Sequence, residues 1–404
     1  MTTAHRTTTG QTVRTGLVGL LATGLAVTAF AVPARADSAP RPGGHQATQQ
    51  ALDAIVKGGT PGVIAQTRDA NGVWNGRAGV GDRETGEPRN ANDRFRIGSI
   101  TKTFVATVLL QMEAERKLDL DDSVEKWLPG LVRGNGNDGR AVTVRQLLNH
   151  TSGIYNYTND PQFQANRLVG EGFLRNRFQR MEPEGLVKVA MGHRPDFAPG
   201  ARHSYSNTGY ILAGLIIEKV SGNSYEHEVR DRIVKPLGLR ATTLPKHRVQ
   251  LPEPSSRAYS TVFRDPQQGT YDVTEQNTTW GWSAGDMVST TGDLNRFMSA
   301  LIRGKLLPKA QLTAMKTTVP DPDVPGGGYG LGIGHTATSC GVKVWGHNGG
   351  LHGSLSDAVT TEDGRHSLAA NQNGDWIVSA NVLDAEFCGT VKPRSELQRK
   401  VLAR

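Results

Sequence analysis

Residues 95–112 read FRIGSITKTFVATVLLQM, a polar start that runs into an apolar helix pattern. Ser99 and Lys102 stand three residues apart at this start, so on a helix their side chains share one face and can reach each other. A partly buried ammonium beside a serine hydroxyl lowers the cost of forming the alkoxide, and a lysine that has lost its proton through burial can accept the serine's proton. The stretch therefore predicts a nucleophilic serine with a lysine as its activating partner.

The Ser-x-x-Lys spacing alone carries little information, because about one copy is expected by chance in a chain of this composition. A second copy does occur, Ser123 with Lys126, directly after Asp121 and Asp122. Acids in front of a serine are typical of an exposed helix start, with the lysine facing solvent. Ser99 instead leads into a helix apolar enough to be buried, which makes it the candidate nucleophile.

A second motif, Tyr205-Ser206-Asn207, precedes an apolar helical pattern at 210–220. A tyrosinate can act as a general base where nearby cations lower its pKa, and an asparagine amide can donate to a substrate carbonyl. The similar Tyr157-Thr158-Asn159 lies in a polar, loop-like stretch, so Tyr205 is preferred. The alternative for Tyr205 is a core tyrosine with a satisfied hydroxyl.

The third motif, His347-Asn348-Gly349, follows a strand-like stretch. A strand edge beside the serine can supply one backbone N–H to the oxyanion, with the N–H of Ser99 as the other donor. Gly349 and Gly350 would let a substrate approach this backbone closely. We therefore expect the backbone of Ser99 and Gly350 to form the oxyanion-binding site.

The order Ser99-x-x-Lys102, Tyr205-x-Asn207 and His347-x-Gly349 resembles the secreted serine D-alanyl-D-alanine carboxypeptidases of the class C β-lactamase-like superfamily. This resemblance to penicillin-recognising serine hydrolases runs from about residue 49 to residue 389. The flanking sequence agrees at residues 95–98, 146–153, 236–239 and 283–285, and at the pairs Cys340-Gly341 and Cys388-Gly389.

The resemblance implies a role for each matching residue. Ser99 is then the nucleophile, Lys102 its activator, Tyr205 the base that also protonates the leaving group, and Asn207 the residue that orients the acyl amide. His347 shapes the electrostatics of the third strand, and Trp280 lines the substrate groove. The resemblance implies no metal and no cofactor; the expected ligands are peptidoglycan stem peptides or other small acyl substrates, with β-lactams as covalent ligands.

Two departures from the family pattern affect the predicted substrate. Class C β-lactamases usually carry lysine where this chain has His347, which argues against an efficient β-lactamase. Carboxypeptidases of the closest type bind the terminal carboxylate with hydroxyls in and after the third motif and with an arginine in the preceding hairpin. The matching positions here hold Asn348, Gly350 and Gly332. Three residues offer themselves as replacements: Arg202, Arg240 and His335.

The leading hypothesis from sequence is a D-Ala-D-Ala carboxypeptidase that binds penicillins and works through an acyl-enzyme. One alternative is an esterase, D-amino-acid amidase or slow β-lactamase on the same scaffold. A lesser alternative, a non-turnover sensor of β-lactams or cell-wall peptides, is disfavoured because the groups for covalent chemistry are complete.

Strand patterns near both ends of the chain predict one discontinuous lobe. Each pair of strands flanks a turn dipeptide: 62–67 and 73–80 flank Asn71-Gly72, and 355–361 and 367–371 flank Asp363-Gly364. Helical patterns lie at 49–56, 144–148, 210–220 and 291–303. We predict an α/β lobe of 49–115 and 285–389, an antiparallel sheet flanked by helices, with an all-helical lobe of 116–284 inserted.

The N-terminal 36 residues predict a secretory signal peptide, since a basic start precedes an apolar run at 17–32 that ends in Ala34-Arg35-Ala36. A retained membrane anchor is the alternative, but the run is shorter than a spanning helix needs. Cleavage would lower the net charge from +8 to +5. A secreted protein with no membrane span follows, with a flexible lead-in at 37–48 and a basic tail at 390–404.

The remaining basic residues are spread along the chain, which predicts weak attraction to anionic surfaces such as a cell wall and not nucleic-acid binding. The two cysteines, Cys340 and Cys388, are expected to form one disulfide in an oxidising compartment. Two free thiols are the alternative.

Overall fold

A computed structural model describes residues 44–263, 268–376 and 381–391. The predicted signal peptide lies outside the described residues, as do residues 37–43 of the lead-in and 392–404 of the basic tail. Within the described ranges, no helix is both long and apolar enough to cross a membrane. Helix α1 (Gln46–Lys57) begins inside the predicted flexible lead-in, where the buried Thr48 donates a hydrogen bond to Glu386.

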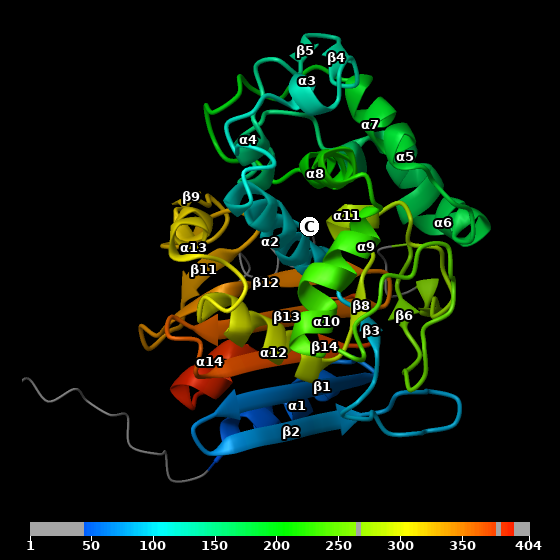
Figure 1. Ribbon diagram of the computed structural model, residues 1–404. Coiled ribbons are helices and arrows are strands. Elements are labelled where there is room, and N and C mark those ends of the chain that lie inside the picture. The colour runs from blue at the N-terminus through cyan, green and yellow to red at the C-terminus, as the bar shows by residue number, and fades with distance from the viewer. Residues whose placement is uncertain (1–43, 264–267, 377–380, 392–404) are drawn as a thin grey trace, which may run out of the picture. The chain divides into compact units, whose positions relative to one another are not determined.

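An eight-stranded antiparallel sheet joins the two ends of the described chain (Figure 1). Its order is β2-β1-β14-β13-β12-β11-β10-β9. Both predicted hairpins are confirmed, and β1 pairs with β14, so the N-terminal and C-terminal hairpins meet in one sheet. The strands are β1 (Gly62–Asp69), β2 (Gly72–Gly79), β9 (Val319–Pro320), β10 (Gly328–Tyr329), β11 (Gly334–Ala337), β12 (Lys343–Leu351), β13 (Ser354–Thr361) and β14 (Ser367–Gln372).

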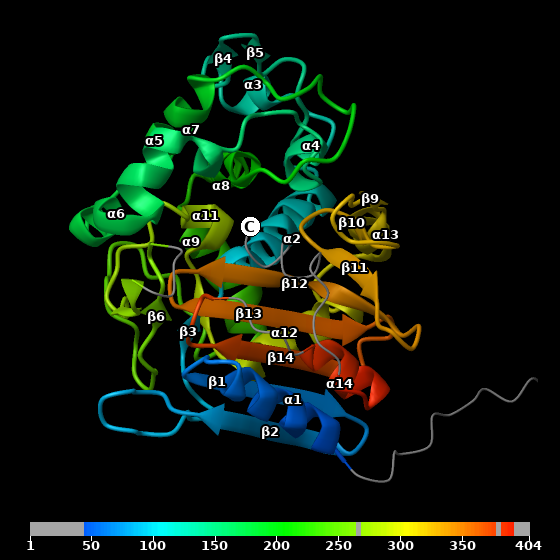
Figure 2. The ribbon, with the colours of Figure 1, turned by 180° about the vertical axis from the view of Figure 1, so that it is seen from behind.

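Helices cover both faces of this sheet. Helix α12 (Thr291–Ile302) lies on one face, and α1 with α14 (Val382–Cys388) lies on the other (Figures 1 and 2). Each face therefore has its own apolar core: a small one under α1 and α14, and a large one that continues into the helical part of the molecule. This arrangement confirms the predicted antiparallel sheet flanked by helices.

The segment between α2 (Thr101–Ala114) and α11 (Trp282–Gly285) is mainly helical. Its helices are α3 (Val124–Trp127), α4 (Val144–Leu148), α5 (Pro161–Phe163), α6 (Gly170–Asn176), α7 (Pro183–Met191), α8 (Asn207–Ser221), α9 (Tyr225–Val229) and α10 (Lys235–Leu237). Two short ladders, β4 (Arg133–Gly134) with β5 (Asn137–Asp138) and β6 (Tyr259–Ser260) with β7 (Tyr271–Asp272), show that this segment is not purely helical.

The shorter elements complete the description. They are β3 (Phe95–Arg96) paired with β8 (Val288–Ser289), α13 (Lys309–Lys316), the 3₁₀ turns η1 (Gly98–Ile100) and η2 (Tyr157–Asn159), and the π-helical turns η3 (Gln164–Leu168) and η4 (Arg230–Val234).

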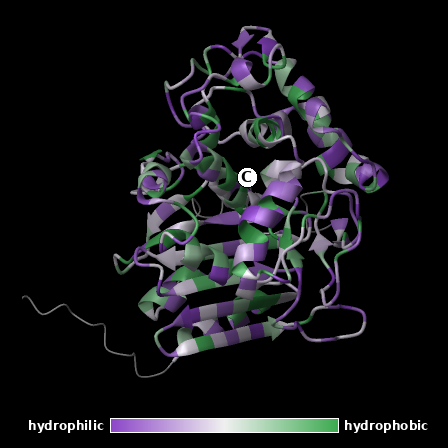
Figure 3. Cartoon of the chain, viewed as in Figure 1, coloured by the Kyte–Doolittle hydropathy of each residue, from purple (hydrophilic) through white to green (hydrophobic). Residues whose placement is uncertain are grey.

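Helix α2 is buried on nearly every side, and it packs against α8, α9 and α11. Figure 3 shows hydrophobic residues along both α2 and α8. A helix that is apolar all round is typical of a protein interior. Because Lys102 is the second residue of α2, its side chain is carried into this interior and is fully buried.

The predicted disulfide between Cys340 and Cys388 is present. It connects the turn between β11 and β12 to the end of α14, across a sequence separation of 48 residues. The bond thus holds α14 against the strand that carries the third motif.

Replacing both cysteines with serine is expected to lower the free energy of unfolding by up to about 4 kcal/mol, because the unfolded chain regains the entropy of an open loop. Denaturant unfolding of the oxidised protein, the reduced protein and the double serine variant measures this. Equal midpoints for all three would contradict the expectation.

Candidate active site

Ser99 lies in the 3₁₀ turn η1, immediately before α2. The residue before it, Gly98, has φ +53°, a backbone conformation that strains other residues. A Cβ placed on Gly98 would also come within 2.6 Å of the Gly350 amide nitrogen. Glycine is therefore required here both by the turn and by the approach of β12.

The Lys102 amine is fully buried and lies at the centre of a hydrogen-bond cluster. Its Nζ lies 2.9 Å from Ser99 Oγ, 2.8 Å from Asn207 Oδ1 and 2.7 Å from the Ala284 carbonyl oxygen. Burial lowers the pKa of Lys102 well below its ordinary value. An ammonium would donate to all three oxygens, whereas a neutral amine keeps a lone pair that can accept the serine proton.

Asn207, the first residue of α8, is held from two directions. Its Oδ1 accepts from Lys102, while its Nδ2 donates to Thr158 Oγ1 at 3.2 Å. Its backbone N–H donates to Asn156 Oδ1 at 3.1 Å. These contacts fix the carboxamide beside the lysine amine.

Tyr205 is half-buried, and its ring centroid lies 4.9 Å from Lys102 Nζ. The same ring lies against that of His150, with 4.2 Å between the centroids. The fold therefore places the second motif directly over the lysine of the first motif. Tyr205 lines the cavity beside Ser99, whereas a tyrosine packed only into the core would not.

The two competing motifs have structural roles. Ser123 Oγ caps α3 by accepting from the Lys126 N–H at 3.3 Å, and Lys126 Nζ pairs with Asp122 at 2.6 Å in an exposed position, as predicted. The prediction of a loop at Tyr157 is wrong. Tyr157 begins η2, and it is fully buried because apolar neighbours enclose its ring. Its hydroxyl donates a hydrogen bond to the Trp280 carbonyl oxygen.

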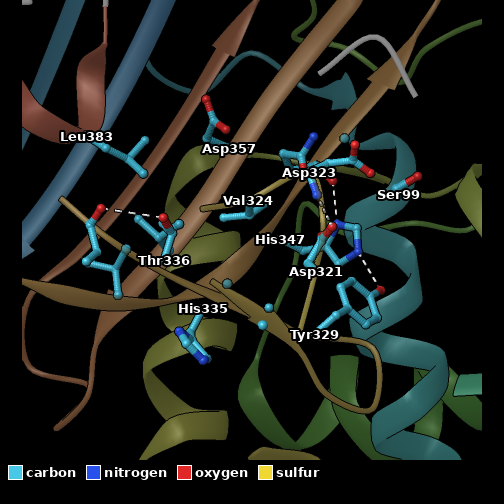
Figure 4. Close-up of a pocket in the computed structure, with 18 of the residues that line it drawn as sticks. Ser99, Asp321, Asp323, Val324, Tyr329, His335, Thr336, His347, Asp357 and Leu383 are labelled. Atoms are coloured by element: carbon cyan, nitrogen blue, oxygen red, sulfur yellow. Dashed lines mark hydrogen bonds between the residues drawn. The ribbon is translucent and has the colours of Figure 1, made fainter. Parts of the chain in front are cut away.

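His347, on β12, is buried with both ring nitrogens engaged. Its Nε2 lies 2.8 Å from the Tyr329 hydroxyl, and its Nδ1 lies 2.5 Å from the Asn348 carbonyl oxygen (Figure 4). Because that carbonyl can only accept, Nδ1 carries the proton and Nε2 accepts from Tyr329. Burial, with Lys102 nearby, lowers the pKa of His347 to about 3, so the imidazole is neutral.

Strand β12 passes very close to Ser99. A Cβ placed on Gly349 would come within 1.9 Å of the Ile97 carbonyl oxygen and 2.9 Å of the Ser99 amide nitrogen. Among the described residues, β12 pairs with β11 only as far as Gly346. The part of β12 beyond Gly346, which does not pair with β11, is therefore the part that lies beside Ser99.

A cavity of about 330 Å³ opens beside Ser99 (Figure 4). The predicted residues Ser99, Tyr205, His347, Asn348, Gly349 and Gly350 all line it. Lys102 and Asn207 lie beneath Ser99 and do not line the cavity, and neither does Trp280, which is half-buried beside His352.

The charges in this cavity have one sign. Three carboxylates line it, those of Asp321, Asp323 and Asp357, and no lysine or arginine of the described segments does. His335 also lines it, and burial lowers its pKa below the ordinary value. No group of three or more His, Cys, Asp or Glu side chains in the described residues is arranged to hold a metal ion.

Sequence reasoning missed several groups that hold the site together. The Ala284 carbonyl belongs to residues 283–285, which matched the family pattern without an assigned role. Thr158 belongs to the Tyr157-Thr158-Asn159 motif, to which the sequence analysis prefers Tyr205-Ser206-Asn207. Tyr329 stands among glycines at 326–332 and gives no pattern of its own. The three aspartates come from two distant segments, so only the fold brings them together.

The β-lactamase family model matches residues 45–360. The chain belongs to the β-lactamase family. With its antiparallel sheet and penicillin-binding relatives, it is a serine hydrolase of the class C-like superfamily. Penicillin-binding protein 4* of Bacillus subtilis is 26% identical over 317 residues, which are 76% of this chain and 66% of that protein. Penicillin-binding protein 4 of Amycolatopsis lactamdurans is 32% identical over 170 residues, which are 42% of this chain and 41% of that protein.

Solved structures of this family include closer matches. A D-stereospecific amidohydrolase from Streptomyces sp. is 55% identical, with a TM-score of 0.81, over 86% of this chain and 99% of that one. A D-amino acid amidase from Ochrobactrum anthropi SV3, in complex with L-phenylalanine, is 28% identical with a TM-score of 0.70, over 81% of this chain and 91% of that one.

Changing Gly349→Ala is expected to reduce hydrolysis by at least about 100-fold, because the methyl group pushes β12 away from η1 and misplaces a backbone donor. Steady-state rates together with circular dichroism measure this. Gly185→Ala, in α7 with open space around the new methyl group, is the matched control. Full activity in Gly349→Ala would show that the close approach is not needed.

Proposed function

We propose that this chain is a D-stereospecific amidohydrolase that forms an acyl-enzyme on Ser99. The observation that carries the proposal is the charge of the cavity beside Ser99, which holds three carboxylates and no lysine or arginine of the described residues. The terminal carboxylate of a D-Ala-D-Ala peptide would find no lysine or arginine of the described residues on the cavity wall to pair with. The 55% identity to the Streptomyces D-stereospecific amidohydrolase supports the same choice.

The proposed reaction begins with attack of Ser99 Oγ on the amide carbonyl carbon. Neutral Lys102 accepts the hydroxyl proton, and the backbone N–H groups of Ser99 and Gly350 bind the oxyanion. The carbon–nitrogen bond then breaks, Tyr205 delivers a proton to the departing amine, and the acyl group stays on Ser99. Water then attacks the acyl carbon and gives a proton to the Tyr205 phenolate, while protonated Lys102 returns its proton to Ser99 Oγ as the acid departs, which restores the enzyme.

The acyl half of the substrate is assigned to the side of Ser99 on which Asn207 lies. The Asn207 carboxamide would orient the acyl part, and Trp280 would line its groove. His347 is neutral and bonded on both ring nitrogens, so its role is to hold β12 and not to carry charge.

D-Ala-D-Ala carboxypeptidase is the second candidate, favoured by the match of Penicillin-binding protein 4* to 76% of this chain. The residues that could replace the missing carboxylate contacts do not favour it. Arg202 and Arg240 are exposed and do not line the cavity, and His335 is held neutral by its lowered pKa. β-Lactams remain proposed covalent ligands under either activity.

We also propose that the protein is secreted after removal of residues 1–36. The disulfide supports this, because such bonds persist in oxidising compartments.

The proposed activity predicts that D-phenylalanine amide is hydrolysed far faster than L-phenylalanine amide or an acylated D-Ala-D-Ala peptide. Ser99→Ala is expected to abolish turnover, and Ser123→Ala, in the competing motif, is the matched control. Ammonia and D-alanine release measure the two reactions. Efficient D-alanine release by the wild-type protein, lost in Ser99→Ala, would establish the carboxypeptidase in place of the amidohydrolase.

Lys102→Arg is expected to lower hydrolysis by about 10²- to 10⁴-fold at every pH, because a guanidinium stays protonated and cannot accept the serine proton. In the wild-type protein burial lowers the pKa of Lys102 well below its ordinary value, which favours the neutral amine, and activity is expected to fall as pH falls through that pKa. Lys126→Arg is the control. Substantial activity in Lys102→Arg would exclude the lysine as the base.

A further inference from the structure

His150 lies in the stretch 146–153, which matches the family pattern and has no part in the proposed reaction so far. It follows α4, a helix that packs against α8 (Figure 1). Its φ of +60° is left-handed, and its side chain is only 1% exposed. Residues other than glycine are uncommon in this conformation, and they persist only where surrounding contacts hold them. The contacts of His150 therefore decide whether it has a role beyond packing.

His150 holds the backbone on both sides of Tyr205. Its carbonyl oxygen accepts from the Ser204 N–H at 2.9 Å, and its ring Nδ1 accepts from the Ser206 N–H at 3.2 Å. Ser204 and Ser206 directly precede and follow Tyr205. The rings of His150 and Tyr205 also lie against each other, with 4.2 Å between their centroids. One residue thus fixes both the main chain and the ring of the proposed base.

The positive φ of His150 is needed for these contacts. Cβ and the carbonyl carbon both turn about the N–Cα bond, so a change to negative φ would carry the imidazole and the carbonyl oxygen away from residues 204–206. The Ser206 N–H can only donate, so Nδ1 carries no proton when it accepts this hydrogen bond. Histidine and asparagine are among the side chains that best tolerate the left-handed conformation. His150 therefore combines a tolerated backbone conformation with an acceptor on its ring.

The residues that follow His150 anchor the same stretch of chain further from the site. The Thr151 carbonyl oxygen accepts from the Gly200 N–H at 2.7 Å, and the Gly153 carbonyl oxygen accepts from the Asp196 N–H at 2.8 Å. A Cβ placed on Gly153 would come within 2.1 Å of a backbone oxygen of the facing segment, so the two segments touch backbone to backbone. Residues 150–153 thus support residues 196–206, and His150 stands at the end nearest to the second motif.

We propose that His150 is a positioning residue for Tyr205. Through the hydrogen bond from the Ser206 N–H and through the contact between the two rings, it holds the phenol hydroxyl where it can deliver a proton to the departing amine. His150 itself takes up and gives away no proton in the reaction. This inference rests on the proposed amidohydrolase function and adds a residue to its machinery.

The role of Tyr205 in the proposed reaction provides a readout that loss of structure alone would not give. An amide needs a proton on its departing nitrogen, whereas p-nitrophenolate is a weak base that leaves an ester without one. A misplaced Tyr205 should therefore slow acylation by an amide and spare acylation by a p-nitrophenyl ester. General damage to the site would slow both substrates alike.

The test compares kcat/KM for D-phenylalanine amide and D-phenylalanine p-nitrophenyl ester, because kcat/KM covers only the steps up to release of the leaving group. His150→Gly keeps the left-handed backbone and removes the ring, and it is expected to lower the value for the amide about 100-fold and for the ester less than about threefold. His150→Asn is expected to restore most of the loss, because asparagine tolerates this φ and its Oδ1 can accept from the Ser206 N–H.

Two further variants calibrate the result. Tyr205→Phe removes the proton donor itself and is expected to show the same amide-selective loss as His150→Gly. Arg116→Gly is the matched control, because Arg116 has φ +59° but is exposed just beyond the end of α2. It is expected to change neither substrate. Equal losses on both substrates in His150→Gly, or no loss on either, would overturn the positioning role.

The wild-type protein provides a second readout should His150→Gly fail to fold. In ¹⁵N NMR spectra of protein labelled at histidine, the Nδ1 signal of His150 is assigned by its loss in His150→Asn. It is expected at the position of an unprotonated imidazole nitrogen, and a protonated Nδ1 would overturn the proposal because it cannot accept from Ser206. If the wild-type protein hydrolyses the amide through Ser99 and no variant of His150 selects between the substrates, only this inference fails. If it turns over neither substrate, the proposed function itself fails, and this inference with it.

Discussion

The amine of Lys102 is fully buried, and burying such a group is tolerated only where hydrogen-bond acceptors surround it. Its three acceptors come from η1, α8 and α11, which are far apart in sequence. The hydrogen bonds of one nitrogen therefore fix Ser99, the second motif and the turn at residues 283–285 relative to one another. The same burial lowers the pKa of the amine, so the constraint that organises the site also favours the neutral amine that the proposed mechanism requires.

A second constraint is the absence of side chains where β12 meets η1. Gly98 and Gly349 bring two backbones so close that the amide nitrogens of Ser99 and Gly350 become neighbours. Backbone donors held by a sheet and a turn need no reorganisation during a reaction, which is the property that an oxyanion site requires. The Tyr329–His347–Asn348 chain of hydrogen bonds adds stiffness to the same strand.

The residues that line the cavity are the reason for proposing a different substrate from the one that the motifs first indicate. The ordered motifs specify acyl transfer to a serine, and they are shared by enzymes with different substrates. At Asn348, Gly350 and Gly332 the sequence indicates only that the family's carboxylate-binding groups are missing. In the structure the cavity is lined by Asp323 and Asp357, and no lysine or arginine of the described residues lines it.

The sequence alone determined the two hairpins and the three motifs, because these are encoded by local pattern and by the spacing of neighbouring residues. The order of the motifs resembles that of a known family, and this resemblance implied the β-lactamase-like fold. The disulfide followed because the chain has only two cysteines. It also separated Ser99 from Ser123 through the polarity of the adjoining helix. Only the tertiary structure decided that Tyr157 is buried, that His347 is neutral, and that aspartates from two distant segments line the cavity beside Ser99. Those properties depend on burial and on contacts between segments distant in sequence, and no local pattern records them.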